Sequence, residues 1–363
     1  MIMKNVIKLF DPSIGKEEEL AIKHVLKSKI WANGAGIGKV SEFENKFKKY
    51  TNSKNCVAVN SGTAALNLAL SIYDIKDKEV ILPSMTFVAT ANAIVMNGGK
   101  PVFVDINEDT LNVDSEHLKS AITDKTKIIL PVHFGGLSCN MDEIKSLAKK
   151  NNLKIIEDAA HAAGSKYKNS KIGSHGDAVC FSFHPVKNLA MPTGGLIAIN
   201  EKNDKKIREI LLARRWCGIT NRKGTDYDVK EIGNNYYMNE FSASIGIVQL
   251  KKLDRLNVIR KKIAKRFFSE LKLESKTKFN KDCSYHLYWI IVKNREKFRK
   301  KMLENGIETG THYKPVHKMS RYKSKIKLEN TERIGKNIVT IPCHPNLNDL
   351  QIDKIVKIVN KYS

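Results

Sequence analysis

One lysine stands where a reactive amine can be built into a protein. Lys187 follows the apolar run Cys180–Phe183, and a second apolar run, Gly194–Ile199, begins soon after it. If both runs are buried strands, Lys187 leaves the end of a core strand, where α/β proteins form their sites. A lysine there can bond to a carbonyl carbon or carry a proton. The alternative is a surface lysine in a loop, because lysine side chains usually lie in water.

Acidic residues end another apolar run. Leu153–Ile156 is followed by Glu157 and Asp158, and His161 comes three residues later. A carboxylate at the end of a buried strand is costly unless a cation pairs with it. That cation can be a protein side chain, a metal ion, or the protonated ring nitrogen of a bound cofactor.

Histidine and cysteine side chains could also form a metal site. The candidates are His133, Cys139, His161, His175 and His184. No two of them have the short spacing that is typical of zinc ligands. The sequence therefore favours no metal.

A third feature suits an anion. Ser61, Gly62 and Thr63 open an expected helix directly after a strand-like run. The free amides of a first helical turn and the positive end of the helix dipole favour a phosphate. Taken alone, an ordinary helix N-cap explains these residues better.

The glycine-rich segment 33–39, NGAGIGK, has the alternation of a dinucleotide fingerprint. No clear strand precedes it and no βαβ unit contains it, so the context of that fingerprint is missing. We interpret the segment as a mobile loop and reject a nucleotide cofactor.

Taken together, the lysine, the carboxylate and the anion site match one cofactor. Pyridoxal 5′-phosphate requires a phosphate cradle, a carboxylate for its ring nitrogen and a lysine for its aldehyde. Ser182, five residues before Lys187, could add a hydroxyl to the phosphate site. Phe87 could stack on the cofactor ring from a neighbouring strand end.

These side chains need a framework, and the chain supplies one. Apolar runs alternate with helix-like segments between about residues 55 and 200, which predicts a mostly parallel sheet covered by helices on both faces. The expected strands are Cys56–Val59, Glu79–Leu82, Pro101–Val104, Lys127–Val132, Leu153–Ile156, Val179–Phe183 and Leu196–Ile199. The expected helices among them are Gly62–Tyr73, Phe87–Met96, Ser115–Ile122 and Met141–Asn151.

The pattern changes after about residue 205. Helices are expected at Phe241–Arg255, continuing through Asn257–Leu273, and at Phe298–Asn305 and Leu350–Tyr362, with a strand at His286–Val292. We therefore predict a large α/β domain over residues 1–250 and a smaller α+β domain over residues 251–363.

Composition limits the partners and the compartment. The net charge of +25 invites a nucleic-acid interpretation, but the lysines are spread through the chain, without a zinc-finger spacing or a long basic block. We expect no nucleic acid, and no membrane, because no apolar run has the length to cross a bilayer. Six scattered cysteines and the lack of a signal-peptide pattern predict a cytoplasmic protein.

Five motifs in a fixed order resemble a known family. They are VNSGTAAL (59–66), LPSMTFVATANAI (82–94), IEDAAHAAG (156–164), GDAVCFSFHPVKN (176–188) and YYMNEFSASIGIVQLKKLD (236–254). The chain resembles the DegT/DnrJ/StrS family of PLP-dependent sugar aminotransferases from about residue 10 to its end. The resemblance implies the fold-type I PLP-transferase architecture. It also implies ping-pong transfer of an amino group from an amino acid, with glutamate as the expected donor, to a keto-sugar that is usually nucleotide-linked.

The resemblance also implies roles for single residues. Lys187 matches the lysine that forms the Schiff base, and Asp158 matches the carboxylate that pairs with the pyridine nitrogen. His161 matches a position beside the ring hydroxyl, and Phe87 matches the aromatic ring that stacks on the cofactor. Because dehydrating relatives carry histidine in place of the lysine, Lys187 favours amino transfer over dehydration.

The phosphate contacts implied by the resemblance come from two subunits. Gly62, Thr63 and Ser182 match the phosphate binders of one chain, and Asn235 matches an asparagine that reaches the phosphate from the partner. A homodimer with shared active sites is therefore expected. The chain departs from the family pattern at Tyr237, where the family usually has arginine.

A second departure follows the lysine, where Met191–Gly195 replaces the usual TGEGG. The missing acid bears on substrate preference. Substrate determinants are expected in the irregular segments 31–38, 214–227 and 310–322, with Trp31, His312 and Tyr313 as candidates. An aminotransferase for a free keto sugar acid or a cyclitol ketone remains an alternative. A non-catalytic cofactor-binding protein and a nucleic-acid-binding protein are remoter ones.

Overall fold

The structure is a computed structural model that describes residues 6–32 and 34–363. The predictions made for the N-terminal segment and for the glycine-rich segment fall partly on residues 1–5 and on Asn33, which lie outside the described residues.

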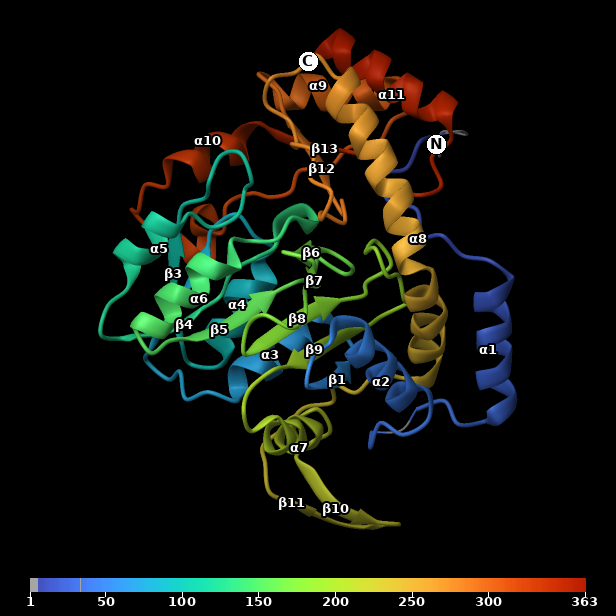
Figure 1. Cartoon of the computed structure of the whole chain (residues 1–363), viewed down its shortest axis with the longest axis vertical. Coiled ribbons are helices and arrows are strands. Elements are labelled where there is room, and N and C mark those ends of the chain that lie inside the picture. Colours follow the sequence, from blue (N-terminus) through green and yellow to red (C-terminus); the bar gives the residue numbers. More distant parts are fainter. Residues whose placement is uncertain (1–5, 33) are drawn as a thin grey trace.

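A seven-stranded sheet forms the centre of the molecule (Figure 1). Its strands are β1 (Asn55–Val59), β2 (Glu79–Pro83), β3 (Lys100–Val104), β4 (Thr126–Ile129), β5 (Lys154–Asp158), β8 (Ala178–Ser182) and β9 (Gly195–Ile199). Their order is β1-β9-β8-β5-β4-β2-β3. Strands β3, β2, β4, β5 and β8 pair in parallel, whereas β9 runs antiparallel to both β8 and β1. The predicted mostly parallel α/β sheet is confirmed.

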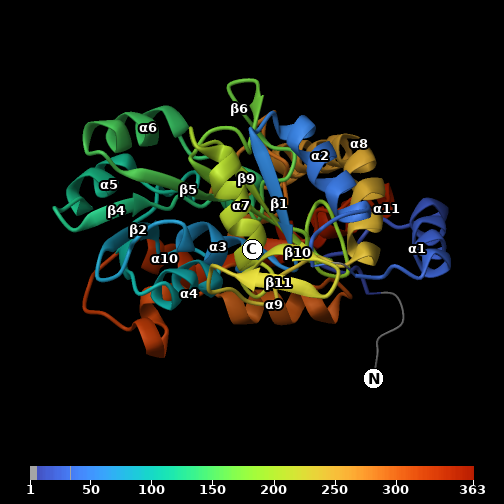
Figure 2. The same ribbon diagram turned by 90° about the horizontal axis from the view of Figure 1, so that it is seen from below.

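Helices cover both faces of this sheet (Figure 2). One face carries α3 (Gly62–Ser71), α4 (Val88–Met96) and α7 (Asp204–Arg214), and the other carries α2 (Lys39–Thr51), α5 (Ser115–Ala121), α6 (Met141–Lys150) and the first half of α8 (Glu240–Glu270). Alternate strand residues point to opposite faces. Val57 and Val59 therefore pack with the α3 side, and Cys56 and Ala58 pack with the α2 side.

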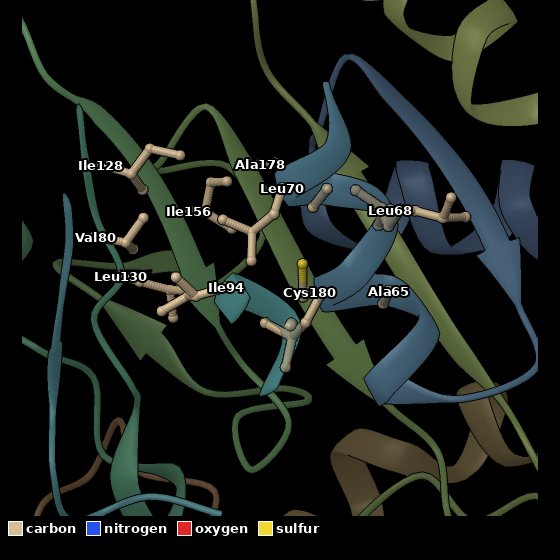
Figure 3. Packing of buried hydrophobic residues seen from close by; sticks show 14 of the residues in the cluster. Ala65, Leu68, Leu70, Val80, Ile94, Ile128, Leu130, Ile156, Ala178 and Cys180 are labelled. Atoms are coloured by element: carbon tan, nitrogen blue, oxygen red, sulfur yellow. The ribbon is translucent and has the colours of Figure 1, made fainter. Parts of the chain in front are cut away.

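The core between the sheet and α3 is built from small and branched side chains (Figure 3). Leu68 and Leu70 of α3 and Ile94 of α4 pack against Ile128 and Ile156 of the strands. These side chains are fully or almost fully buried. The packing fixes α3 against the sheet, and so fixes the position of its first turn.

Helix α8 joins the two parts of the chain. Its first half packs against α1 (Lys16–Ser28) and α2 (Figure 1). Ile263 and Phe267 in its second half belong to a separate core, which also contains β12 (Tyr288–Ile291), α9 (Arg295–Glu304), β13 (Ile338–Ile341) and α11 (Asp349–Tyr362). The domain boundary predicted at residue 250 lies inside α8, and the division into two domains stays a prediction.

The remaining elements are short. They are β6 (Lys166–Tyr167), β7 (Ser170–Lys171), β10 (Ile219–Lys223), β11 (Asp226–Val229), α10 (Glu329–Asn337) and the 3₁₀ turns η1 (Phe134–Gly136), η2 (Val316–Lys318) and η3 (Ser320–Tyr322). The hairpin β10–β11 projects from the body beyond α7 (Figure 1). Its side chains are exposed or half-buried, and Ile232 just after it is almost fully exposed.

Within the described part of the chain, no helix combines the length and the apolar character that a membrane crossing requires. Five of the six cysteines are buried free thiols, and Cys217 is exposed.

Candidate active site

A cavity of about 340 Å³ lies at the carboxyl ends of β1, β2, β5 and β8. Nine of the predicted site residues line it, namely Gly62, Thr63, Phe87, Asp158, His161, Ser182, Lys187, His312 and Tyr313. Ligand sites of open α/β sheets form at this edge because the loops that follow parallel strands converge there. Residues from position 62 to position 313 thus meet in one place.

The first turn of α3 forms one wall of the cavity. Ser61 caps the helix, because its side chain accepts a hydrogen bond from the amide of Ala64. The amides of Gly62 and Thr63 in this turn have no intrahelical acceptor. A Cβ atom at Gly62 would lie 2.6 Å from the Cβ of Ser182, so glycine is what allows β8 and α3 to approach. The N-cap interpretation is correct for Ser61, and the amides beside it remain available to an anion.

Asp158 forms the acidic end of the cavity. Its carboxylate accepts hydrogen bonds from the Thr90 hydroxyl at 2.8 Å and from the Ala160 amide at 3.1 Å. The residue is 4% exposed. Burial raises the pKa of the Asp158 carboxyl, while the two hydrogen bonds and the positive charges of Lys187 and His133 oppose that rise. A further cation in the cavity would favour the ionised carboxylate.

Lys187 lies in the loop between β8 and β9 and lines the same cavity. Burial lowers the pKa of its amine to about 8, and the negative charge of Asp158 opposes the shift. A pKa near 8 leaves about one amine in ten neutral at pH 7, compared with about one in a few thousand for an unperturbed lysine. The amine is therefore prepared for nucleophilic and proton-transfer chemistry.

His161 and Tyr313 close the cavity from another side. The Gly135 amide donates to His161 Nδ1 at 3.3 Å, so the neutral ring carries its proton on Nε2 and donates it to the Tyr313 hydroxyl at 3.0 Å. Burial and the nearby charges of Lys187 and His312 lower the pKa of His161 well below its ordinary value. Phe87 faces the same region, with its ring centroid 6.0 Å from that of Tyr313.

Two predicted site residues do not line this cavity. The Trp31 side chain is 53% exposed and packs beside Phe241. Asn235 lies at the outer edge of the sheet, where its carbonyl accepts a hydrogen bond from the Asn60 side chain at 3.2 Å. Neither residue reaches the cavity of its own chain.

The part of the glycine-rich segment that the structure describes is held by buried charges. Arg215, which is fully buried, donates to the carbonyl of Ala35, and Glu240 accepts the amide of Lys39 at 2.7 Å. A Cβ atom at Gly36 would collide with the Arg215 guanidinium. These contacts explain the glycines by close packing. Within the described stretch before Gly34, no strand leads into the segment as a dinucleotide site requires.

The structure adds residues to the site that the sequence analysis did not single out. Thr90 lies three residues after Phe87 on α4 and reaches Asp158, and the Thr86 and Thr90 hydroxyls are 2.8 Å apart. The motif that contains Phe87 holds both threonines, so its position was the available signal. His286 lies 3.4 Å from the Lys187 amine, measured from Nε2 to Nζ, and no local pattern around it indicates that contact. Among the described residues, no group of three or more histidine, cysteine or acidic side chains could hold a metal.

The site residues fit pyridoxal phosphate. The turn at Gly62 can take the phosphate, and Asp158 is a buried carboxylate that a protonated ring nitrogen would complement. Lys187 offers an amine with a lowered pKa on the same cavity. The roles of the individual residues stay predictions.

Comparisons with known proteins agree with this chemistry. The sequence model of the DegT/DnrJ/EryC1/StrS aminotransferase family matches residues 12–360. The chain is 38% identical to UDP-4-amino-4,6-dideoxy-N-acetyl-beta-L-altrosamine transaminase of Campylobacter jejuni, over 93% of this chain and 92% of the relative. It is 36% identical to spore coat polysaccharide biosynthesis protein SpsC of Bacillus subtilis, over 96% and 95%. The PLP-form of a putative sugar aminotransferase from Streptococcus pneumoniae matches with a TM-score of 0.93 at 29% identity, over 98% of each chain.

The fold and the cavity define a PLP-dependent transferase of the α/β class. The chain belongs to the DegT/DnrJ/EryC1/StrS aminotransferase family. The predicted family, enzyme class and cofactor are confirmed.

Proposed function

We propose that this enzyme transfers an amino group from an amino acid, with glutamate as the expected donor, to a nucleotide-linked keto-sugar. The observation that carries the proposal is the convergence of Lys187, Asp158 and the first turn of α3 on one cavity, in a chain that is 38% identical to a UDP-sugar transaminase. The proposed reaction runs in two halves, and the keto acid formed from the donor leaves before the keto-sugar binds.

Different residues of the chain would bind the phosphate, cover the ring and hold the proton on the ring nitrogen. Bound pyridoxal phosphate supplies an aldehyde that takes up the amino group and a ring that withdraws electrons from the reacting carbon. Gly62, Thr63 and Ser182 would bind the phosphate, and Phe87 would cover the ring. Asp158 would hold the proton on the ring nitrogen, which keeps the ring electron-withdrawing.

Lys187 would act twice. Its neutral amine would hold the cofactor covalently before the reaction. Once the donor has replaced it, the free amine would move a proton at Nζ within the cavity, for which the lowered pKa suits it. No other lysine or arginine among the described residues lines this cavity.

The position of Asn235 bears on how the protein assembles. Because Asn235 does not reach the cavity of its own chain, we propose that it contributes to the cavity of a second copy in a homodimer with shared sites. Symmetric dimers are the commonest assemblies of soluble proteins, which favours this arrangement. His312 and Tyr313 on the cavity wall and the exposed Trp31 are the proposed substrate contacts. A cytoplasmic location remains part of the proposal.

The test uses enzyme that has been converted to its pyridoxamine 5′-phosphate form and freed of the donor. This form is mixed with a panel of nucleotide-linked keto-sugars, free keto sugar acids and cyclitol ketones, and amino transfer is followed by absorbance and by mass spectrometry of the product. We expect single-turnover amination of one or more nucleotide-linked sugars. Amination restricted to free sugar acids or cyclitol ketones would overturn the proposed substrate class.

A further inference from the structure

A histidine from a distant part of the sequence touches the amine of Lys187. His286 Nε2 lies 3.4 Å from Lys187 Nζ, and His286 is 5% exposed. Among the described residues, this ring is the single hydrogen-bond partner that the structure gives to the amine. His286 is not among the residues that line the cavity.

Hydrogen bonds on both sides of His286 in the sequence hold this contact in place. Asn188, the neighbour of Lys187, donates to the carbonyl of Ser284 at 2.8 Å and so ties the lysine loop to the segment that carries His286. Gly135 accepts the amide of Leu287 at 3.2 Å, on the other side of His286. The Phe10 ring stacks on the imidazole with a centroid distance of 5.5 Å. The ring therefore has a defined place beside the lysine amine.

The charges around the ring keep it neutral. Burial lowers the pKa of His286 well below its ordinary value, and the positive charges of Lys187 and Arg260 lower it further. The rings of His161 and His312 would also oppose a proton on His286 in their charged forms, but burial lowers the pKa of both. Lys187 in turn faces the carboxylate of Asp158 and the nearby ring of His184. A neutral imidazole beside an amine can accept a hydrogen bond from it in either protonation state of the amine.

We propose that His286 is a positioning residue that holds the amine of Lys187 whenever that amine is not bonded to the cofactor. The proposal rests on the proposed role of Lys187. An amine on a flexible four-carbon chain has many rotamers, and a buried partner restricts them to those that keep the amine beside the cavity. The amine then stays close to the cavity during the half of the reaction in which it is free.

The experiment measures covalent capture of pyridoxal phosphate by cofactor-free enzyme at a series of pH values. In capture, the amine nitrogen bonds to the aldehyde carbon and the aldehyde oxygen leaves as water. Only the neutral amine reacts, so the rate in the parent enzyme should rise with pH around a midpoint near 8. Absorbance gives the rate, and borohydride trapping with peptide mapping gives the site.

Three variants separate positioning from packing. In His286→Phe, the apolar ring cannot accept a hydrogen bond from the ammonium, so the midpoint should fall by about one pH unit or more, and the rate above the midpoint should fall about tenfold. His286→Gln, which places an amide oxygen near the former Nε2, should restore both values towards those of the parent. His344→Phe is the matched control, because His344 is as buried as His286 but bonds to the Lys8 carbonyl instead.

An unchanged midpoint in folded His286→Phe enzyme would overturn the inference, whatever happens to the rate. A midpoint that falls equally in His344→Phe would do the same. Circular dichroism establishes folding. If the phenylalanine variant does not fold, His286→Leu, whose side chain also cannot accept a hydrogen bond, takes its place in the same measurement. Failure of the parent to capture the cofactor at Lys187 would instead refute the proposed function.

Discussion

Lys187 meets two opposing demands. Its amine must be neutral to react, yet it lies near the carboxylate of Asp158, which favours the ammonium form. Burial is the larger of the two effects, and it lowers the pKa to about 8. The carboxylate is shared with Thr90 and Ala160, whose hydrogen bonds stabilise its negative charge without the lysine.

The first prediction identifies the lysine chemically. Borohydride reduction of the enzyme with bound cofactor should attach the cofactor to Lys187, because its amine alone among the lysines lines the described cavity. Peptide mapping by mass spectrometry gives the labelled residue. Label on any other lysine in the folded enzyme would refute the assignment.

The second prediction concerns the carboxylate. Asp158→Asn should retain cofactor but lose at least about tenfold in kcat, because a neutral amide cannot stabilise a protonated ring nitrogen and charge-assisted hydrogen bonds contribute about 1.5–3 kcal/mol. Steady-state kinetics measures the loss. Asp114→Asn is the control, because Asp114 caps α5 and does not line the cavity, and asparagine caps helices equally well. Equal kcat in the two variants would contradict the role of Asp158.

The third prediction is a dependence of stability on pH. The folded pKa of Lys187 lies below its ordinary value of 10.5, so the unfolded chain binds more protons between about 8 and 10.5. The cost of the buried charge is therefore complete below pH 8 and disappears as the pH rises towards 10.5. Lys187→Met should stabilise the cofactor-free protein by about 1–3 kcal/mol at neutral pH, and by less near pH 10. Urea unfolding at the two pH values measures this, and an equal effect at both would contradict the buried charge.

At the residue scale, the sequence was most informative about candidate site residues that directly follow an apolar run. Asp158 and Lys187 each come at or soon after the end of a strand, and strand ends share one edge of the sheet, so their meeting could be predicted. The contact between Lys187 and His286 could not be predicted, since packing of α8 and the C-terminal core creates it. Trp31 was chosen from an irregular segment. It lies away from the cavity because its side chain packs beside Phe241 at the start of α8, which the sequence could not show.

At the element scale, the first turn of α3 leaves no room for a larger side chain at Gly62. Gly62→Ala should raise the dissociation constant of the cofactor about tenfold or more, because the added Cβ would lie 2.6 Å from the Cβ of Ser182 and overpacking costs about 1–3 kcal/mol. Absorbance titration of cofactor-free enzyme measures the change.

The control for this variant is Gly15→Ala. Gly15 has extended backbone, and its added Cβ would meet nothing closer than 4.0 Å. Alanine favours helix more than glycine does, so loss of α3 is not expected in Gly62→Ala. Cofactor affinity that is unchanged in Gly62→Ala would show that this turn does not hold the phosphate.

Alternation of apolar runs and helical segments was enough to place the seven strands of the sheet within a few residues. It could not give the direction of β9, because a strand that is buried on both faces has the same pattern in either direction. The two consecutive helical patterns after residue 240 form the single helix α8. The side chains of the hairpin β10–β11 are mostly exposed, including those of Tyr227 and Val229, so the hairpin lacked a buried apolar pattern to detect.

At the scale of the whole molecule, the proposed dimer makes a prediction about mixed subunits. A Lys187→Ala chain and a chain with Asn235→Ala should each be impaired as homodimers. Subunit exchange should build one heterodimer site from Lys187 of the second chain and Asn235 of the first, while the other site carries both lesions. Activity recovered on mixing, measured after exchange has been verified by mass spectrometry, would support a shared site.

Two controls accompany the mixing experiment. Asn235→Ala alone must weaken cofactor binding, and a mixture of Lys187→Ala with itself must stay inactive. If exchange occurs and no activity returns, Asn235 serves its own chain or has no part in the site.

The position of β1 in the sheet affects how the protein is made. This strand pairs only with β9 in the described sheet, and its first residue, Asn55, lies opposite Ile199. On the ribosome, β1 therefore emerges long before its partner exists, and at about 5–20 residues per second the delay is on the order of ten seconds. During that time an apolar strand without a partner is open to other chains. Because Gly62 meets Ser182 only when this edge of the sheet is complete, newly made chains should be unable to hold the cofactor until β9 has been synthesised.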